Sequence, residues 1–127
     1  MAGWRVMDAT AVEEVTDRWV AAWTTGRTST LFTLLAAGAR VESNLDPDGD
    51  FIEKLTGFAA ALTSVSVFTR TVIDQRVALV YDCAVDAEQF RLAEFLVVTP
   101  TGLVAEVRRV YDLHAVERLM PELLLET

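Results

Sequence analysis

Three runs in the second half of the chain alternate their side chains between two faces and are separated by short polar breaks. The runs are Val77–Val85, Phe90–Val98 and Leu103–Tyr111. They are rich in Val, Leu, Phe and Tyr, which suit a pleated, half-buried strand. The breaks at 86–89 and 100–102 carry Asp, Pro and Gly, residues that are typical of turns. Because short connections join antiparallel neighbours, the pattern predicts a three-stranded antiparallel meander.

Both faces of this predicted meander are largely apolar. An antiparallel sheet that exposes one face to water alternates apolar and polar residues along each strand. That alternation is not clean here. We therefore expect helices to cover one face and a second subunit to cover the other.

Helical and strand periodicities predict the remaining elements. A helix over Thr10–Thr25 carries an apolar stripe with the spacing of one buried helix face, made of Val12, Val15, Trp19, Ala22 and Trp23. The other expected elements, in order, are helix Ser29–Ala37, strand Ala39–Leu45, helix Phe51–Leu62, strand Val65–Ile73 and, after a cap at Asp112, helix Leu113–Met120. Helices gathered on one side of a mainly antiparallel sheet form an α+β fold. A strongly curved sheet would leave a cone-shaped cavity beneath the first helix.

Composition limits the partners and the location that we expect. The 127 residues predict a single domain over 1–127, of which 52% are hydrophobic. The formal net charge of -8 argues against partners that present phosphates, both nucleic acids and anionic membranes. Cys83 is the single cysteine, so no internal disulfide can form. No run resembles a signal peptide or a membrane span, and we expect a cytoplasmic protein.

The sequence predicts no metal site and no cofactor. The acidic stretch Asp46–Asp50 invites comparison with a calcium loop, which needs Gly at its sixth place and Glu at its twelfth. Phe51 and Gly57 occupy those places, so a solvated turn is the expected structure. No cluster has the spacing of metal ligands, and no glycine-rich phosphate loop is present.

The order of elements, together with the segments ALVYDCAV, FRLAEFLVV and VAEVRRVYD, resembles the nuclear transport factor two-like superfamily in its SnoaL-like branch. The match extends over nearly the whole chain. It implies a cystatin-like cone, in which a curved, mainly antiparallel sheet carries helices on its concave face. The match is specific for the fold and weak for function. The same fold hosts isomerases, cyclases, dehydratases, epoxide hydrolases and non-catalytic partners.

The resemblance also marks positions where family enzymes carry catalytic groups. Trp19 occupies the place of the oxyanion-hole tyrosine of the ketosteroid isomerases, Ala93 that of their second donor, and Ser43 that of their general base. Arg109 stands where the SnoaL cyclases and limonene-epoxide hydrolases hold an acid. Their Arg-x-Asp pair is similar in position to Tyr81 and Cys83. These family mechanisms are therefore not expected here.

The comparison further implies which side chains would line the cone. The implied ligand-binding residues are Trp19, Trp23, Tyr81, Cys83, Arg91, Phe95, Arg109 and Tyr111, and Ala93 and Val107 share their face. The opposite face, with Val80, Leu92, Leu96 and Val110, would meet a partner subunit in a homodimer, since family members often dimerise in this way.

Several of these side chains have a structural alternative. Arg109 would clamp an anion or a carbonyl oxygen, with help from Arg91, or it would pair with a buried carboxylate or reach the rim. Tyr81 and Tyr111 would donate to a ligand or to the backbone. The tryptophans fit the core better than a ligand stack. Cys83 would need a base to act as a nucleophile, and the single histidine, His114, lies beyond the last strand.

Three further charged residues, Glu94, Asp82 and Arg108, are placed by this alternation on the partner-facing side. An ion-paired interface explains them better than an acid-base pair does. Two classes of function stay open. The first is a pocket protein that binds a small hydrophobic molecule carrying a carbonyl or acid group without turning it over, or a dimeric partner of another enzyme. The second is a cyclase, isomerase or dehydratase. In that case Arg109 and Tyr81 would polarise a carbonyl, and Asp46 or Asp112 would move a proton.

Overall fold

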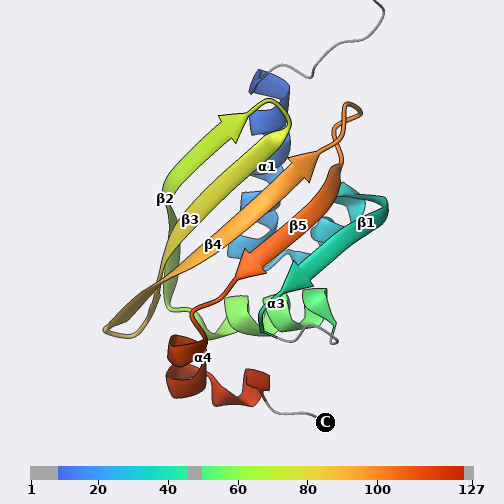
Figure 1. Ribbon diagram of the computed structural model, residues 1–127. Helices are drawn as coiled ribbons and strands as arrows, with labels where there is room; N and C mark the ends of the chain where they lie inside the picture. Colours follow the sequence, from blue (N-terminus) through green and yellow to red (C-terminus); the bar gives the residue numbers. More distant parts are fainter. Residues whose placement is uncertain (1–8, 46–49, 125–127) are drawn as a thin grey trace, which may run out of the picture.

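The computed structural model describes residues 9–45 and 50–124 (Figure 1). Within these residues the strands form one curved sheet in the order β1-β5-β4-β3-β2. Their bounds are β1 Leu35–Ser43, β2 Ser64–Ile73, β3 Arg76–Val85, β4 Glu88–Val98 and β5 Val104–Val110. β1 runs parallel to β5, and all other neighbours are antiparallel. The predicted α+β class and the antiparallel meander of β3, β4 and β5 are confirmed.

The helices lie on one face of this sheet, which we call the inner face, and the bare side is the outer face (Figure 1). Their bounds are α1 Ala9–Thr24, α2 Leu31–Leu34, α3 Phe51–Ala61 and α4 Leu113–Leu119, with short 3-10 turns at Thr28–Thr30 and Pro121–Leu124. α1 lies behind the strands in Figure 1, and α3 and α4 gather at the end where β1 and β5 finish. No helix in the described part of the chain is long and apolar enough to cross a membrane.

Side-chain caps fix where two of these helices begin. Asp50 accepts a hydrogen bond from the backbone N–H of Glu53 at the start of α3, at 3.0 Å. Asp112 does the same for Ala115 at the start of α4, also at 3.0 Å. Such caps satisfy amide groups that have no partner inside the helix. The predicted cap at Asp112 is confirmed, so β5 passes directly into α4.

The second predicted helix is confirmed over its first part and wrong at its end, because its last residues belong to a strand. α2 ends at Leu34, and β1 begins at Leu35, four residues earlier than expected. Gly38 has a φ of 71°, which favours glycine, and the pairing of β1 with β5 is irregular between Leu35 and Arg40. The glycine therefore marks a bulge inside a strand instead of the end of a helix.

The turn between β3 and β4 decides which side chains face the helices. Val85 pairs with Glu88, so the loop has two residues and places Tyr81 opposite Leu92 and Leu79 opposite Glu94. When a hairpin loop has an even number of residues, odd-numbered residues of one strand pair with even-numbered residues of the next. Paired residues point to the same face of the sheet. The face predicted for the middle strand is therefore wrong. Leu92, Glu94 and Leu96 are buried on the inner face, and Arg91, Ala93 and Phe95 lie on the outer face.

The apolar stripe of α1 packs onto this inner face. Val12, Val15, Trp19, Ala22 and Trp23 are all buried, as the periodicity predicts. Trp19 and Trp23 have no exposed surface and belong to one hydrophobic core with the inner side chains of β3, β4 and β5. The interior of the sheet is therefore filled largely by the protein's own aromatic and aliphatic side chains.

Candidate functional site

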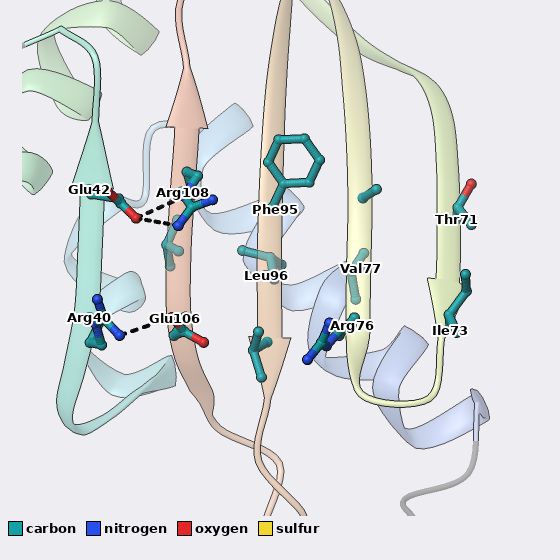
Figure 2. A pocket seen from close by; sticks show the side chains of 13 residues that line it. Arg40, Glu42, Thr71, Ile73, Arg76, Val77, Phe95, Leu96, Glu106 and Arg108 are labelled. Carbon is teal, nitrogen blue, oxygen red and sulfur yellow. Dashed lines mark hydrogen bonds and ion pairs between the residues drawn. The ribbon is translucent and has the colours of Figure 1, made fainter.

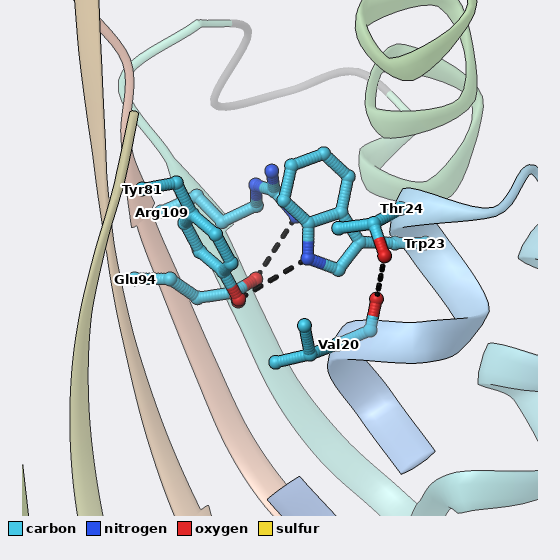
Figure 3. A network of polar contacts seen from close by, with 6 residues as sticks. All are labelled: Val20, Trp23, Thr24, Tyr81, Glu94 and Arg109. Atoms are coloured by element: carbon cyan, nitrogen blue, oxygen red, sulfur yellow. Dashed lines mark hydrogen bonds and ion pairs between the residues drawn. The ribbon is translucent and has the colours of Figure 1, made fainter. Parts of the chain in front are cut away.

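A chain of hydrogen bonds crosses the buried interior from α1 to β5 (Figure 3). The indole N–H of Trp23 donates to the Tyr81 hydroxyl at 3.1 Å, and that hydroxyl donates to Glu94 Oε1 at 2.6 Å. The other carboxylate oxygen, Oε2, accepts from Arg109 Nη1 at 2.9 Å. All four side chains have 0% exposed surface. One helix and three strands thus contribute to a single polar network that bulk water does not reach.

Strand register brings the charged pair of this network together. Leu79, Glu94 and Arg109 are direct neighbours across β3, β4 and β5 and point to the inner face. Opposite charges at directly paired positions attract, and a buried arginine needs such a partner. The alternative in which Arg109 pairs with a buried carboxylate is therefore the one observed, with Glu94 as the partner.

Aromatic rings enclose the Arg109 guanidinium on its other sides. Its central carbon lies 4.3 Å from the Trp23 ring centroid, 5.3 Å from that of Tyr111 and 6.0 Å from that of Phe58. Phe58, from α3, also packs edge-on against Tyr111 at 4.8 Å between centroids. A cation over aromatic faces is stabilised by the negative charge at the ring faces. The protein's own cation therefore occupies an aromatic cage.

This cage leaves hydrogen-bond donors without acceptors. Arg109 Nε and Nη2 have no partner within hydrogen-bonding geometry, nor does Trp19 Nε1. An unpaired buried donor costs about 1–3 kcal/mol, and more when it belongs to a charged group. Such exceptions are rare in folded proteins and call for an explanation. Arg109 thus has two buried donors without a partner in strict geometry, although the Tyr111 hydroxyl lies close to the guanidinium.

The charges in the network set its protonation states. Burial alone would lower the pKa of Arg109, but the nearby Tyr111, Glu94 and Tyr81 outweigh it and the pKa is raised, so the guanidinium stays charged. Burial, reinforced by Glu94, holds the pKa of Tyr81 well above its usual value of 10.0. Burial also raises the pKa of Tyr111, against the opposing effect of Arg109. Both phenols are therefore neutral at physiological pH.

Cys83 lies on the inner face near Arg109 and is 2% exposed. Burial raises the pKa of its thiol from 9.0 to about 12, although the charge of Arg109 opposes this shift. A thiol with a high pKa is a poor nucleophile at neutral pH. Cys83 is therefore a packing residue in this geometry.

Alkaline pH should weaken the fold through this thiol. The unfolded chain releases the proton near pH 9.0, whereas the folded chain holds it until about pH 12. The stabilisation is therefore complete below pH 9 and lost progressively above it. Urea unfolding at several pH values between 8 and 10 should show a steeper decline for the wild type than for Cys83→Ala, and equal slopes would contradict the assignment.

The structure brings together most of the predicted ligand-binding residues and separates two of them. Trp19, Trp23, Tyr81, Cys83, Arg109 and Tyr111 are all buried on the inner side. Arg91 and Phe95 were also expected to line the ligand site, and this prediction is wrong, because the two-residue turn places both on the outer face. There Arg91 pairs with Asp82 at 2.9 Å, and Phe95 is 44% exposed.

Glu94 is the site residue that the sequence analysis missed. Ala93, matched by resemblance to a family donor, pairs with Val80 and Val110 and lies on the outer face. The residue next to it supplies the inner-face carboxylate. The length of the turn could have identified Glu94 from the sequence. Any loop with an even number of residues between β3 and β4 places Glu94 on the same face as Tyr81.

The remaining candidates do not join the network. Asp112 is exposed and caps α4, His114 is exposed on α4, and Asp46 lies outside the described residues. Arg108 pairs with Glu42 on the outer face at 2.7 Å. Among the described residues no three His, Cys, Asp or Glu side chains lie together as a metal ion would require.

A shallow groove of about 530 Å³ crosses the outer face (Figure 2). Two rows of residues that pair across the strands, from β2 to β1, lie along this groove. The first row is Thr71, Ala78, Phe95, Arg108 and Glu42. The second row is Ile73, Arg76, Val97, Glu106 and Arg40. Apolar side chains occupy the middle of both rows, and ion pairs line the side near β1. This groove thus lies on the side away from most of the predicted site, and a second hollow of about 540 Å³ is lined by residues that include Cys83, Phe90 and Arg91.

Comparison with known proteins identifies the architecture. No protein-family model matches the sequence, and no curated protein is significantly similar to it. Among solved structures, a steroid delta-isomerase from Pseudomonas aeruginosa is 12% identical, with a TM-score of 0.72 and coverage of 92% of this chain and 90% of that one. A protein named as a SnoaL-like polyketide cyclase from Jannaschia sp. CCS1 is 19% identical, with a TM-score of 0.60 and coverage of 94% and 96%.

A third similar structure contains a small molecule. This protein from Catenulispora acidiphila has a ketosteroid isomerase-like fold and was solved in complex with trimethylamine. It is 20% identical, with a TM-score of 0.61 and coverage of 85% of this chain and 92% of that one. The chain has a nuclear transport factor two-like, SnoaL-like fold. At these identities the likeness concerns the fold, and the function must be argued from the site.

Proposed function

We propose that this SnoaL-like protein binds a small, mostly apolar molecule on the inner face of its sheet, with Arg109 as the polar anchor. The observation that carries the proposal is the pair of unpartnered donors, Nε and Nη2, on a guanidinium with no exposed surface. An acceptor oxygen on a ligand would satisfy both. Trp19, Trp23, Tyr81, Cys83 and Tyr111 would surround the ligand's apolar part, as is usual in small-molecule sites.

The Phe58 side chain would have to move to make room for a ligand beside Arg109. Its ring borders Arg109 and packs against Trp23 and Tyr111, with centroids 6.4 and 4.8 Å away. It comes from α3, which is joined to the C-terminal 3-10 turn through Lys54 Nζ and the Leu123 carbonyl oxygen at 2.6 Å. A ligand the size of one ring would fit where the Phe58 ring now lies. Binding would therefore couple to an outward shift of α3.

Binding suits this site better than proton transfer. Both oxygens of Glu94, the buried carboxylate of the network, are already engaged, one by Tyr81 and one by Arg109. A general base must come within hydrogen-bond reach of the proton that it removes, and both of these oxygens are already directed toward other donors. The cyclase or isomerase alternative lacks such a group at the network, and this supports the proposal of a binding protein. The cytoplasmic location stays a prediction from the sequence.

Acetophenone and α-methylstyrene form a matched pair of probes. They have nearly the same shape, and the carbonyl oxygen of the first is replaced by a methylene group in the second. The wild type should bind acetophenone more tightly, with a shift of the Arg109 Nε–H signal in ¹⁵N NMR titrations. In the double variant Arg109→Met with Glu94→Gln, which leaves no unpaired buried charge, acetophenone should lose about 1.5–3 kcal/mol, the range for hydrogen bonds to charged groups. Binding of α-methylstyrene should change little.

Arg118→Met serves as the control, because Arg118 forms an exposed ion pair with Glu88 far from the network. It should leave both affinities unchanged. If neither probe binds the wild type, or if both lose affinity equally in the double variant, Arg109 has only a structural role and the proposed function is wrong.

We also propose a homodimer through the outer face, with a revised set of residues. Leu92 and Leu96, expected there from the sequence, are buried on the inner face. The apolar residues that the outer face does expose include Ile73, Phe95 and Val110, at 65%, 44% and 44%. Ile73 and Phe95 line a groove whose ion pairs offer both signs of charge to a second copy. Apolar patches rimmed by charge are typical of association sites.

Phe95→Glu should convert this dimer into a monomer, because it places a charge at the middle of the groove. Sedimentation velocity at tens of micromolar protein would measure the change. Phe32→Glu is the matched control, since Phe32 is 62% exposed on α2 and lies away from the outer face. A wild type that sediments as a monomer, or a dimer that survives Phe95→Glu, would contradict the proposal.

A further inference from the structure

We propose that Glu94 makes the Arg109 site selective for uncharged ligands that carry a carbonyl oxygen. The inference rests on the proposed function and adds the chemical class of the ligand. It narrows the expectation from the sequence, in which Arg109 would clamp either an anion or a carbonyl oxygen.

The first step is the balance of charge around Arg109. Its guanidinium pairs with Glu94 at 2.9 Å, and both side chains have no exposed surface. The guanidinium also faces the rings of Trp23, Tyr111 and Phe58, the Tyr111 hydroxyl and the Cys83 thiol, and none of these groups is charged at neutral pH. The positive charge is therefore already compensated before any ligand arrives.

The second step is the effect of adding a charge to this balanced pair. A ligand carboxylate bound at Nε and Nη2 would bring a second negative charge close to the Glu94 carboxylate, where no water screens the two. Two carboxylates that share a site repel strongly. A buried charge without its own partner is also costly. A carbonyl oxygen fills the same two donors and adds no charge.

The third step separates carbonyl compounds from alcohols. A hydroxyl oxygen can accept from Arg109, but its own proton then needs an acceptor. Each Glu94 oxygen already accepts one hydrogen bond, from Tyr81 at 2.6 Å and from Arg109 at 2.9 Å, so an alcohol proton would have to share an oxygen with one of them. Among the described residues, the buried side-chain atoms without a partner are Arg109 Nε, Arg109 Nη2 and Trp19 Nε1, and all three are donors. A carbonyl group, which accepts and does not donate, is the best complement to such a site.

Four probes of nearly equal size test this order, namely acetophenone, 1-phenylethanol, benzoate and α-methylstyrene. Their dissociation constants for the wild type would be measured by ¹⁵N NMR, with the side-chain N–H signals of Arg109, Trp19 and Trp23 as reporters of the site. Acetophenone should bind most tightly. Benzoate should bind at least about tenfold more weakly, since each tenfold step corresponds to 1.4 kcal/mol of repulsion.

Glu94→Gln should reverse the order of the two oxygen probes, because the guanidinium then lacks its counter-charge. Benzoate should gain at least about tenfold, a step of 1.4 kcal/mol, and acetophenone should change little. Glu88→Gln, which removes a carboxylate from an exposed ion pair, is the matched control and should alter neither. Thermal unfolding of each variant would confirm that it folds, and if Glu94→Gln does not, the wild-type comparison decides alone.

The outcomes separate the two proposals. Benzoate binding to the wild type as tightly as acetophenone, or no gain for benzoate in a folded Glu94→Gln protein, would overturn the selectivity and leave the binding function standing. If 1-phenylethanol equals acetophenone, the carbonyl preference is wrong. If no probe binds, the proposed function fails and this inference fails with it.

Discussion

Glu94→Ala is expected to lower the free energy of unfolding by about 3–5 kcal/mol, because it leaves the Arg109 guanidinium buried without a counter-charge. The loss includes the hydrogen bond that Glu94 accepts from Tyr81 at 2.6 Å. Folded domains have total stabilities of about 5–15 kcal/mol, so the variant should be close to unfolding. Urea denaturation followed by tryptophan fluorescence would measure the change.

Removing both charges should cost much less than removing one. Glu94→Leu together with Arg109→Met replaces a buried ion pair by apolar side chains, a change that is often neutral or stabilising. An exposed pair provides the comparison, since Arg108 and Glu42 are 61% and 57% exposed. Glu42→Ala should cost no more than about 1 kcal/mol. A Glu94→Ala protein as stable as Glu42→Ala would mean that water reaches Arg109 and that the network is not closed.

The fold could be predicted from the sequence because its signals are local. The stripe from Val12 to Trp23 has helical spacing, and Asp112 precedes a helix at the capping position. These features depend only on residues a few positions apart in the sequence, so the spacing of apolar and capping residues is enough to predict them. Gly38 shows the limit of such signals, since the same glycine can end a helix or form a bulge, and only the pairing of β1 with β5 decides between them.

The site could be predicted only in part, because it depends on contacts between distant strands. Alternation grouped the residues of each strand into two faces, the family resemblance indicated that Arg109 and Tyr81 lie on the pocket face, and both lie on the inner face. Glu94 was placed on the wrong face because the face of the middle strand was inferred from the family resemblance and not from the register of β4 against β3, which an even-numbered turn sets. The closed interior also could not be predicted from the sequence, because it depends on how Phe58 and Trp23 fill the space around Arg109.

Trp23→Ala is expected to destabilise the protein by about 3–5 kcal/mol, the range for removing a large aromatic side chain from a core. Trp23 has no exposed surface, and its ring lies 4.3 Å from the Arg109 guanidinium and 4.9 Å, edge-on, from Tyr81. Trp19→Ala should fall in the same range, because Trp19 is equally buried. Chemical denaturation of both variants would give the two losses.

Phenylalanine substitutions separate the polar role of Trp23 from its bulk. Trp19 Nε1 has no hydrogen-bond partner, so Trp19→Phe removes a buried unpaired donor together with some packing. Trp23→Phe removes a similar volume and also breaks the 3.1 Å bond to the Tyr81 hydroxyl. It should therefore cost more than Trp19→Phe by about 0.5–1.5 kcal/mol, the net value of one hydrogen bond. Equal losses for the two variants would mean that the network from Trp23 to Arg109 adds nothing to stability beyond packing.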